Sequence, residues 1–295
     1  MRVTESNIAA NFLNNINQTR ERITVEQAQL ATGKRVTKVS DDPQATDSIL
    51  RLKSFLSANA QYQTNNAQAE ADTEATESAL NNFSDLLVNL KGILSQATNG
   101  AQTLNLQTYA DQIDQLLGDA VGIANTKSNG RYLFGGTNTL QQPFTLAADH
   151  SSVTVNPNGI TGSIEVPINE GVNQTVNIDG QEAFQGTSIF DLMIEVKNKL
   201  QSGLNPTSDE SAALDTYLEH VATETGKAGS MLGNIQNNDA MLSSQQTQIQ
   251  QLLSVQQDSD VAETTLKFNQ DQLSLQAALS SGASVLPKTL LDFLK

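Results

Sequence analysis

Apolar side chains recur at steps of three, four and seven residues along most of this chain, which places them on one face of an α-helix. The first such segment ends at Thr32-Gly33. Glycine suits a helix C-cap there, because it reaches the left-handed conformation without a Cβ penalty. The pattern predicts an amphipathic helix whose seam is Ile8, Phe12, Ile16, Ile23 and Leu30.

The sequence ATGKRVTKVSDDP, residues 31–43, follows as a basic connector. Aspartate is a favoured N-cap residue, and proline fits the first helical position, where its missing N–H costs nothing. We therefore predict a helix stop, a connector and a helix restart. The residues that carry this prediction are Gly33, Lys34, Arg35, Asp41, Asp42 and Pro43.

From Pro43 to Asn99-Gly100, two rows of residues repeat every seven positions, which predicts coiled-coil-like packing of long helices. The middle of both rows is polar or small, so we expect thin contacts there. The first row is Ala45, Leu52, Asn59, Asn66, Thr73, Leu80, Leu87 and Leu94. The second row is Ser48, Phe55, Tyr62, Ala69, Thr76, Phe83, Leu90 and Ala97.

A shorter helix is predicted next, ending at Asn129-Gly130, and then the period changes. Its inward face is Leu106, Ala110, Ile113, Leu117, Ala120 and Ala124. Between Gly130 and Phe190, the segments GSIEVPI and QTVNID alternate like short strands, and the pairs Asn158-Gly159 and Asp179-Gly180 are typical of turns. This stretch predicts a small β-rich insert.

Helical spacing returns at TSIFDLMIEVKNKL, and Thr207 with Glu210 predicts a capping box for a further helix. That helix carries one row of apolar and small residues: Leu214, Leu218, Val221, Thr225, Ala228, Leu232, Ile235, Leu242, Ile249 and Leu253. The last helix has Leu266 and Leu273 on one register, and Pro287 predicts a kink or break within it. Its second register, which we assign to the seam, is Leu275, Leu279, Leu286, Leu290 and Phe293.

Together these patterns predict a mainly α fold with a small β-rich insert. Long antiparallel, coiled-coil-like helices form an elongated rod, and the N- and C-terminal helices pair. We divide the chain into terminal coiled-coil segments (1–42 with 260–295), a helical rod (43–130 with 189–259) and the β-rich outer insert (131–188).

Composition and charge exclude several classes of protein. The chain has 295 residues, no Cys, no Trp and a formal net charge of -15, so disulfides, thiolate nucleophiles and Cys-ligated zinc are excluded. Residues 1–60 carry a net charge of about +2, and this basic patch is too short for nucleic acid. The opening residues lack the apolar region of a secretory signal, and no stretch is apolar enough to cross a membrane.

No residue set predicts catalysis, a cofactor or a metal site. His150 and His220 lie in different kinds of segment and lack metal-ligand spacing, so we expect surface residues. Asp41 and Asp42 fit helix capping better than acid–base chemistry. Gly135-Gly136 lacks the context of a phosphate-binding loop. We therefore expect a protein that is not an enzyme.

Four segments carry a resemblance to a known family. ATGKRVTKVSDDPQAT resembles the signature of flagellin-type axial proteins. NGRYLFGGTNTLQQPF, TVNIDGQEAFQGTSIFDLM and the C-terminal AETTLKFNQDQLSLQAALSSGASVLPKTLLDFL resemble the hook-associated protein 3 family, the hook-filament junction proteins of the flagellin superfamily. The resemblance spans nearly the whole chain.

The resemblance implies a flagellin-like architecture and an extracellular place at the hook-filament junction. Family members are exported unfolded by the flagellar type III path, without a cleaved signal peptide, and a dedicated chaperone binds their C-terminal region. They assemble as a homo-oligomeric ring beside hook-associated protein 1 and flagellin or the cap side. The cations of the basic connector are then expected either to contact acidic faces of neighbouring subunits or to be exposed to solvent.

Two alternatives stay open at this stage. Flagellin itself shares the terminal architecture, but it usually has a longer outer region and lacks the RYLFGGT form. An enzyme or ligand-binding protein that uses the β insert would need a convergent polar pocket there.

Overall fold

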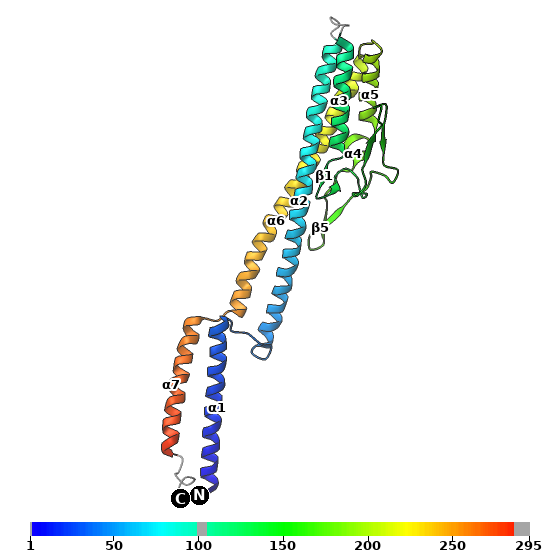
Figure 1. Cartoon of the computed structure of the whole chain (residues 1–295). Helices are drawn as coiled ribbons and strands as arrows, with labels where there is room; N and C mark the ends of the chain where they lie inside the picture. The colour runs from blue at the N-terminus through cyan, green and yellow to red at the C-terminus, as the bar shows by residue number, and fades with distance from the viewer. Residues whose placement is uncertain (1, 99–104, 286–295) are drawn as a thin grey trace. The chain divides into compact units, whose positions relative to one another are not determined.

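The computed structural model describes residues 2–98 and 105–285, which belong to two compact units. The terminal unit comprises the chain up to Ala58 and from Gln245 onward, and the central unit is Asn59–Ser244. Figure 1 shows the elements. The helices are α1 (Arg2–Thr32), α2 (Pro43–Thr98), α3 (Leu106–Ala124), α4 (Gly180–Phe184), α5 (Ser188–Gln201), α6 (Ser208–Gln257) and α7 (Val261–Val285). The strands are β1 (Lys127–Ser128), β2 (Arg131–Tyr132), β3 (Phe144–Leu146), β4 (Val153–Val155), β5 (Glu165–Asn169) and β6 (Val172–Thr175).

Helices from the two halves of the chain pair within each unit, as the repeats predict. In the terminal unit α1 packs along α7 (Figure 1). In the central unit α2 packs along α6, and both contribute to one core, for example with Leu87 and Val221. The predicted fold class is therefore confirmed: the chain is mainly helical, its β structure is small, and its terminal helices are paired. The three-part domain division stays a prediction.

The main core of the central unit lies where α2, α3, α5 and α6 meet the β-rich segment. Five phenylalanine rings lie at its centre, all 0% exposed, from α2, α4, α5 and the β-rich segment. The ring centre of Phe184 on α4 lies 4.8 Å from those of Phe83 and Phe134, 5.5 Å from that of Phe144 and 5.8 Å from that of Phe190. Such edge-on and tilted pairs are favourable for aromatic rings.

The predicted inward face of α3 is confirmed at every position. The buried side chains of this helix include Leu106, Ala110, Ile113, Leu117, Ala120 and Ala124. They pack against α5, whose predicted helix is also confirmed. The glutamate half of the predicted capping box before α6 is confirmed, since Glu210 Oε2 accepts hydrogen bonds from Thr207 N at 2.6 Å and Thr207 Oγ1 at 3.1 Å.

The predicted end of α3 at Asn129-Gly130 is wrong. The helix ends at Ala124, and Asn129 and Gly130 form the turn of the β1–β2 hairpin with φ angles of 49° and 81°. Two successive positive φ angles are the requirement of a tight hairpin turn, which Asn-Gly satisfies. Asp179-Gly180 is likewise no turn, because the Asp179 side chain accepts from Glu182 N and starts α4.

The β structure consists of three separate antiparallel hairpins in the described residues. Their registers pair Ser128 with Arg131, Thr145 with Thr154 and Val166 with Gln174. The strand predicted in GSIEVPI is confirmed as β5, whereas QTVNID is mostly wrong, because β6 covers only its first two residues, Gln174 and Thr175. Hairpin β5–β6 lies against the α2·α6 pair, where Asn65 donates to Pro167 O at 2.9 Å and Asn238 donates to Ile168 O at 2.6 Å.

The seam of α2 changes character along its length. Asn59, Asn66 and Thr73 are only 5%, 1% and 1% exposed, although they are polar. Asn59 Nδ2 donates to Leu242 O at 3.0 Å, whereas the amide of Asn66 finds no hydrogen-bond partner among the described residues. The predicted second row is wrong at Phe55, which is 53% exposed while Leu56 is half-buried. A row of sevens drifts by about 20° per repeat around a straight helix, so it cannot face one partner throughout.

Candidate functional site

The α1·α7 pair carries the residues predicted to mediate assembly. Its contact is a regular alternation of four- and three-residue steps on both helices, which is coiled-coil spacing. The buried and half-buried positions on α1 with this spacing are Phe12, Ile16, Thr19, Ile23, Glu26 and Leu30. On α7 they are Thr264, Phe268, Asp271, Leu275, Ala278 and Gly282. Gln29 and Gln272, beside these rows, are also half-buried.

The structure brings together part of the predicted assembly seam. Ile16 is 6% exposed, and Phe12, Ile23, Leu30 and Leu275 are half-buried. Leu279 points away and is 46% exposed, as are Leu266 at 68% and Leu273 at 67%. Predicted seam residues Leu286, Leu290 and Phe293 and the kink at Pro287 lie outside the described residues, as does the side chain of Ile8.

Close approach of the two helices depends on Gly282. A Cβ atom at this position would overlap the ring of Phe12 on α1. The ring therefore occupies the space that a side chain on α7 would otherwise take. Sequence spacing did not identify this contact, because a lone glycine within a helix gives no signal about its partner.

Charged groups take several seam positions in the α1·α7 pair. Arg22 donates from Nε to Asp271 Oδ2 at 2.7 Å and from Nη2 to Oδ1 at 3.2 Å, and this hydrogen bonding lowers the pKa of Asp271. Glu26 is 9% exposed, and its Oε2 has no hydrogen-bond partner in the described structure. Burial and, secondarily, the charge of Asp271 raise the pKa of Glu26.

The connector folds as the sequence predicts. Gly33 has a φ of 68°, and its N–H donates to Gln29 O at 2.8 Å, so it ends α1 as a left-handed cap. Asp42 Oδ1 accepts from Ala45 N at 3.0 Å, and α2 begins at Pro43. The stop and the restart are both confirmed.

The carboxylates of the connector organise its backbone. Asp41 Oδ2 accepts from Lys38 N at 2.9 Å and Thr37 N at 3.0 Å, and these bonds lower the pKa of Asp41. Arg35 pairs with Asp42 at 3.1 Å and also donates to Gln256 O at 3.0 Å. A cation at the C-terminal carbonyls of α6 is favourable for the helix dipole. Arg35 thus serves the chain itself, whereas the ammonium of Lys34 has no hydrogen bond or ion pair with the described residues.

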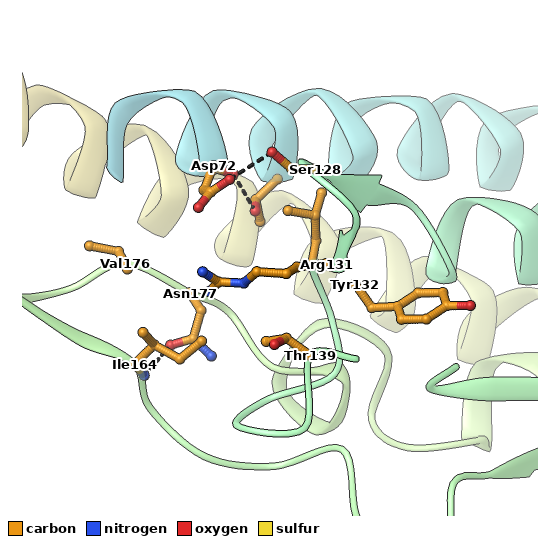
Figure 2. A pocket seen from close by; sticks show the side chains of 10 residues that line it. Asp72, Ser128, Arg131, Tyr132, Thr139, Ile164, Val176 and Asn177 are labelled. Atoms are coloured by element: carbon orange, nitrogen blue, oxygen red, sulfur yellow. Dashed lines mark hydrogen bonds between the residues drawn. The ribbon is translucent and has the colours of Figure 1, made fainter. Parts of the chain in front are cut away.

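A small cavity lies in the central unit beside the segment RYLF. Its volume is about 30 Å³, which is room for about one water molecule. Figure 2 shows the guanidinium of Arg131 extending beneath α2 between Asp72 and Asn177. Ser128 Oγ donates to Asp72 Oδ1 at 2.6 Å, and Asn177 Oδ1 accepts from Ile164 N at 2.6 Å. These groups serve the fold, so the cavity does not provide the convergent site that a ligand-binding insert would need.

An ionic cluster around one buried lysine connects α3, α5 and the β3–β4 hairpin. Lys197 is 4% exposed, and its Nζ donates to Asp114 Oδ1 at 3.0 Å and His150 O at 2.6 Å. His150 Nδ1 lies 2.9 Å from Asp114 Oδ2. Burial of Asp114 acts to raise its pKa, but hydrogen bonds from Lys197 and His150 outweigh this effect and lower the pKa. His150 is thus more than the surface residue that its spacing predicted, and it holds the hairpin in place.

The described ranges contain no group of three or more His, Asp or Glu side chains placed to hold a metal ion. Across the same residues, no helix is both long enough and apolar enough to span a membrane.

Comparison with known proteins agrees with this architecture. Residues 3–139 match the bacterial flagellin N-terminal helical region. Flagellar hook-associated protein 3 of Escherichia coli K12 is 24% identical over 272 residues, which cover 85% of this chain and 86% of the relative. The protein of the same name from Salmonella typhimurium LT2 is 31% identical over 125 residues, covering 39% of this chain and 37% of that one.

Solved structures share the fold. The crystal structure of flagellar hook-associated protein 3 from Legionella pneumophila superimposes with a TM-score of 0.61 at 16% identity, covering 70% of this chain and 98% of that one. The likeness to the Escherichia coli protein covers 85% of the chain and therefore includes parts of both units. The chain is therefore similar to flagellar hook-associated protein 3 over most of its length, and its residues 3–139 match the bacterial flagellin N-terminal helical region.

Proposed function

We propose that this chain is a structural adaptor subunit that joins the hook to the filament of the bacterial flagellum. The observation that carries the proposal is the unfinished packing of the α1·α7 pair. Its seam mixes apolar, small and charged residues, and Leu266 and Leu273 lie on the outside at 68% and 67% exposure. Exposed leucines on a long helix support packing against further helices of the assembly.

The assembled form is a homo-oligomeric ring at the hook-filament junction, with hook-associated protein 1 on one side and flagellin or the cap on the other. The subunit reaches this extracellular place through the flagellar type III path as an unfolded chain, and a dedicated chaperone binds its C-terminal region. A chain with few aromatic residues and no Cys suits such transit, because it has no disulfides to break.

Labelled antibody on purified flagella tests this proposal. A band at the boundary between hook and filament is the expected result. In cells that lack the subunit, hooks should form and filaments should be released into the medium, and the wild-type chain should restore attachment.

Flagellin is the second candidate, and the match of residues 3–139 to the flagellin N-terminal region favours it. The same antibody experiment separates the two candidates. Uniform label along the filament would establish a filament subunit and reject the adaptor. Seeded growth of long filaments from the purified chain would point the same way.

A further inference from the structure

An open groove runs along the α1·α7 pair around the buried carboxylate of Glu26. Charged and polar side chains of both helices form most of its walls, and its lining is Gln18, Glu21, Arg22, Val25, Glu26, Gln29 and Lys267. All of these residues belong to the terminal unit. The groove therefore lies within one folded body of the chain.

Both cations beside Glu26 are already engaged with other carboxylates. Arg22 makes its two hydrogen bonds with Asp271, and the ammonium of Lys267 lies 2.7 Å from Glu263 Oε1. Glu26 is nine-tenths buried, and its Oε2 has no hydrogen-bond partner in the described structure. A buried acceptor without a hydrogen-bond partner lowers the stability of the α1·α7 pair, so a donor from another molecule would recover that free energy.

The groove can admit such a donor without a backbone change. The side chains of Arg22 and Lys267 that cover Glu26 are 53% and 61% exposed, so they can rotate toward solvent. Around Glu26 the carboxylates of Glu21, Asp271 and Glu263 outnumber the two cations. The complementary ligand is therefore a single ammonium or guanidinium group.

Among the cations of the connector, Lys34 is presented in a suitable way. Lys34 is exposed, and its ammonium is unpaired in the described structure. Its backbone is fixed, because it follows the left-handed cap of Gly33 and forms a bridge with Asp258. By contrast, Arg35 is paired with Asp42, and the charge of Lys38 acts on Asp41. A fixed backbone lowers the entropy that an interface must overcome.

Resting on the proposed function, we propose that Glu26 accepts the ammonium of Lys34 from a second copy of this chain. The pair is an inter-subunit contact and not an intramolecular one. Glu26 lies six residues, roughly 9 Å at 1.5 Å per residue, before the end of α1 at Thr32, and Lys34 follows the Gly33 cap. Lys34 would then set the placement of each terminal helix pair against the next in the ring.

Exchanging the charges of Glu26 and Lys34 tests the pairing in cells that lack their own copy of the gene for this chain. Lys34→Glu and Glu26→Gln should each lower the number of attached filaments at least tenfold while secretion of the subunit stays normal. Glu26→Lys combined with Lys34→Glu should restore attachment to within threefold of wild type. Arg20→Glu, an exposed cation on α1, is the matched control and should attach normally.

Crosslinking tests the contact directly, since the chain has no native Cys. Glu26→Cys and Lys34→Cys chains, co-expressed and treated in intact flagella with a short bis-maleimide, should give a dimer. Glu26→Cys with Arg20→Cys should give none. Normal attachment by Lys34→Glu, failed rescue by the charge exchange, or equal crosslinking through Arg20→Cys would overturn the pairing. Wild-type label away from the junction would instead reject the proposed function.

Discussion

The α3·α5 contact of the central unit and the α1·α7 contact of the terminal unit are both helix pairs, but they bury different material. Between α3 and α5, Ile113, Leu117, Phe190 and Met193 are 0% exposed. Between α1 and α7, Ile16 is the one large apolar side chain that is fully buried among those described, and it is flanked by Thr19 and Glu26. The α3·α5 contact therefore buries large apolar side chains completely, whereas most of those in the α1·α7 contact stay half-buried.

The difference indicates what each contact is for. Burial of a large apolar side chain contributes about 1.5–3 kcal/mol, so a contact rich in such side chains can hold a domain by itself. The terminal pair instead exposes Leu266 and Leu273, which could add burial only against another molecule. The central unit is thus built for stability of the single chain, whereas the exposed leucines of the terminal unit suit the assembly that we propose.

Removing an aromatic ring from the central core should have the largest effect. Phe184→Ala should lower the free energy of unfolding by about 3–5 kcal/mol, because the ring packs against four other phenylalanines and leaves a cavity. Urea unfolding of the purified chain measures this change. Phe55→Ala is the matched control and should change it by less than about 0.5 kcal/mol, since the ring is 53% exposed. Equal losses in both variants would refute the contrast between the units.

Adding a side chain at Gly282 should affect the terminal unit alone. Gly282→Val should cost about 1–3 kcal/mol of α1·α7 pairing through overlap with Phe12. Hydrogen exchange should quicken in α1 and α7 and stay unchanged in α3 and α5. Ala277→Val, at an exposed position on α7, serves as the control. Phe12→Ala should partly rescue Gly282→Val, and a failure to do so would exclude the proposed overlap.

Substitution at the α1 cap should have a smaller effect. Gly33→Val forces a β-branched residue to adopt a φ of 68° and should cost about 1–2 kcal/mol. Gly33→Asn should cost less, because asparagine tolerates the left-handed region. Filament attachment by secreted subunits measures the outcome. Loss of secretion in proportion to attachment would instead assign Gly33 to export or folding.

The smallest effect is expected from pH, and it should have opposite signs at two carboxylates of the terminal unit, Asp42 and Glu26. The pKa of Asp42 is lowered by its bond from Ala45 N and by Arg35, so its stabilisation is complete above the ordinary carboxyl pKa and is lost as pH falls through the lowered value. The pKa of Glu26, which faces Arg22, Lys267 and Asp271, is raised, so the α1·α7 pair gains stability as pH falls through that value.

Hydrogen exchange from neutral pH down to about pH 3 separates the two carboxylates, after correction for the intrinsic exchange rate. Amides at the start of α2 should lose protection in acid, whereas those of α1 around Glu26 should gain it first. Glu26→Gln should abolish the gain without changing the loss. A gain that persists in Glu26→Gln would assign it to another group.

Local chemistry made much of this fold predictable. Helix caps depend on adjacent residues, so Gly33, Thr207 and a cap at Asp41 or Asp42 were found from the sequence, and the structure selects Asp42. The face of α3 was predicted throughout because its apolar steps match the helix period. Asn129-Gly130 was misread because the same dipeptide ends a helix or turns a hairpin, and only the pairing of Lys127 with Tyr132 decides between them.

Contacts between distant segments could not be predicted in this way. Lys197 meets Asp114 and His150 across separations of 83 and 47 residues, and each residue alone has an ordinary surface pattern. Burial of Glu26 was equally hidden, because a charged residue at a seam position usually indicates a solvated face. Its environment depends on Asp271 and Lys267 of a helix more than 200 residues away.

The polar stretch of α2 has a consequence for alignment. Leu80, Leu87 and Leu94 repeat so regularly that sliding α2 by seven residues along α6 would exchange one leucine for the next. The leucines alone would therefore permit more than one alignment of α2 along α6. The buried asparagines do not select one alignment, because Asn59 and Asn66 are themselves seven residues apart and either amide could reach Leu242 O. The β5–β6 hairpin does select one: Asn65 of α2 donates to Pro167 O at 2.9 Å, and Asn238 of α6 donates to Ile168 O at 2.6 Å. A seven-residue slide would put Ala58 or Asp72 in the place of Asn65, and neither side chain has an N–H to donate.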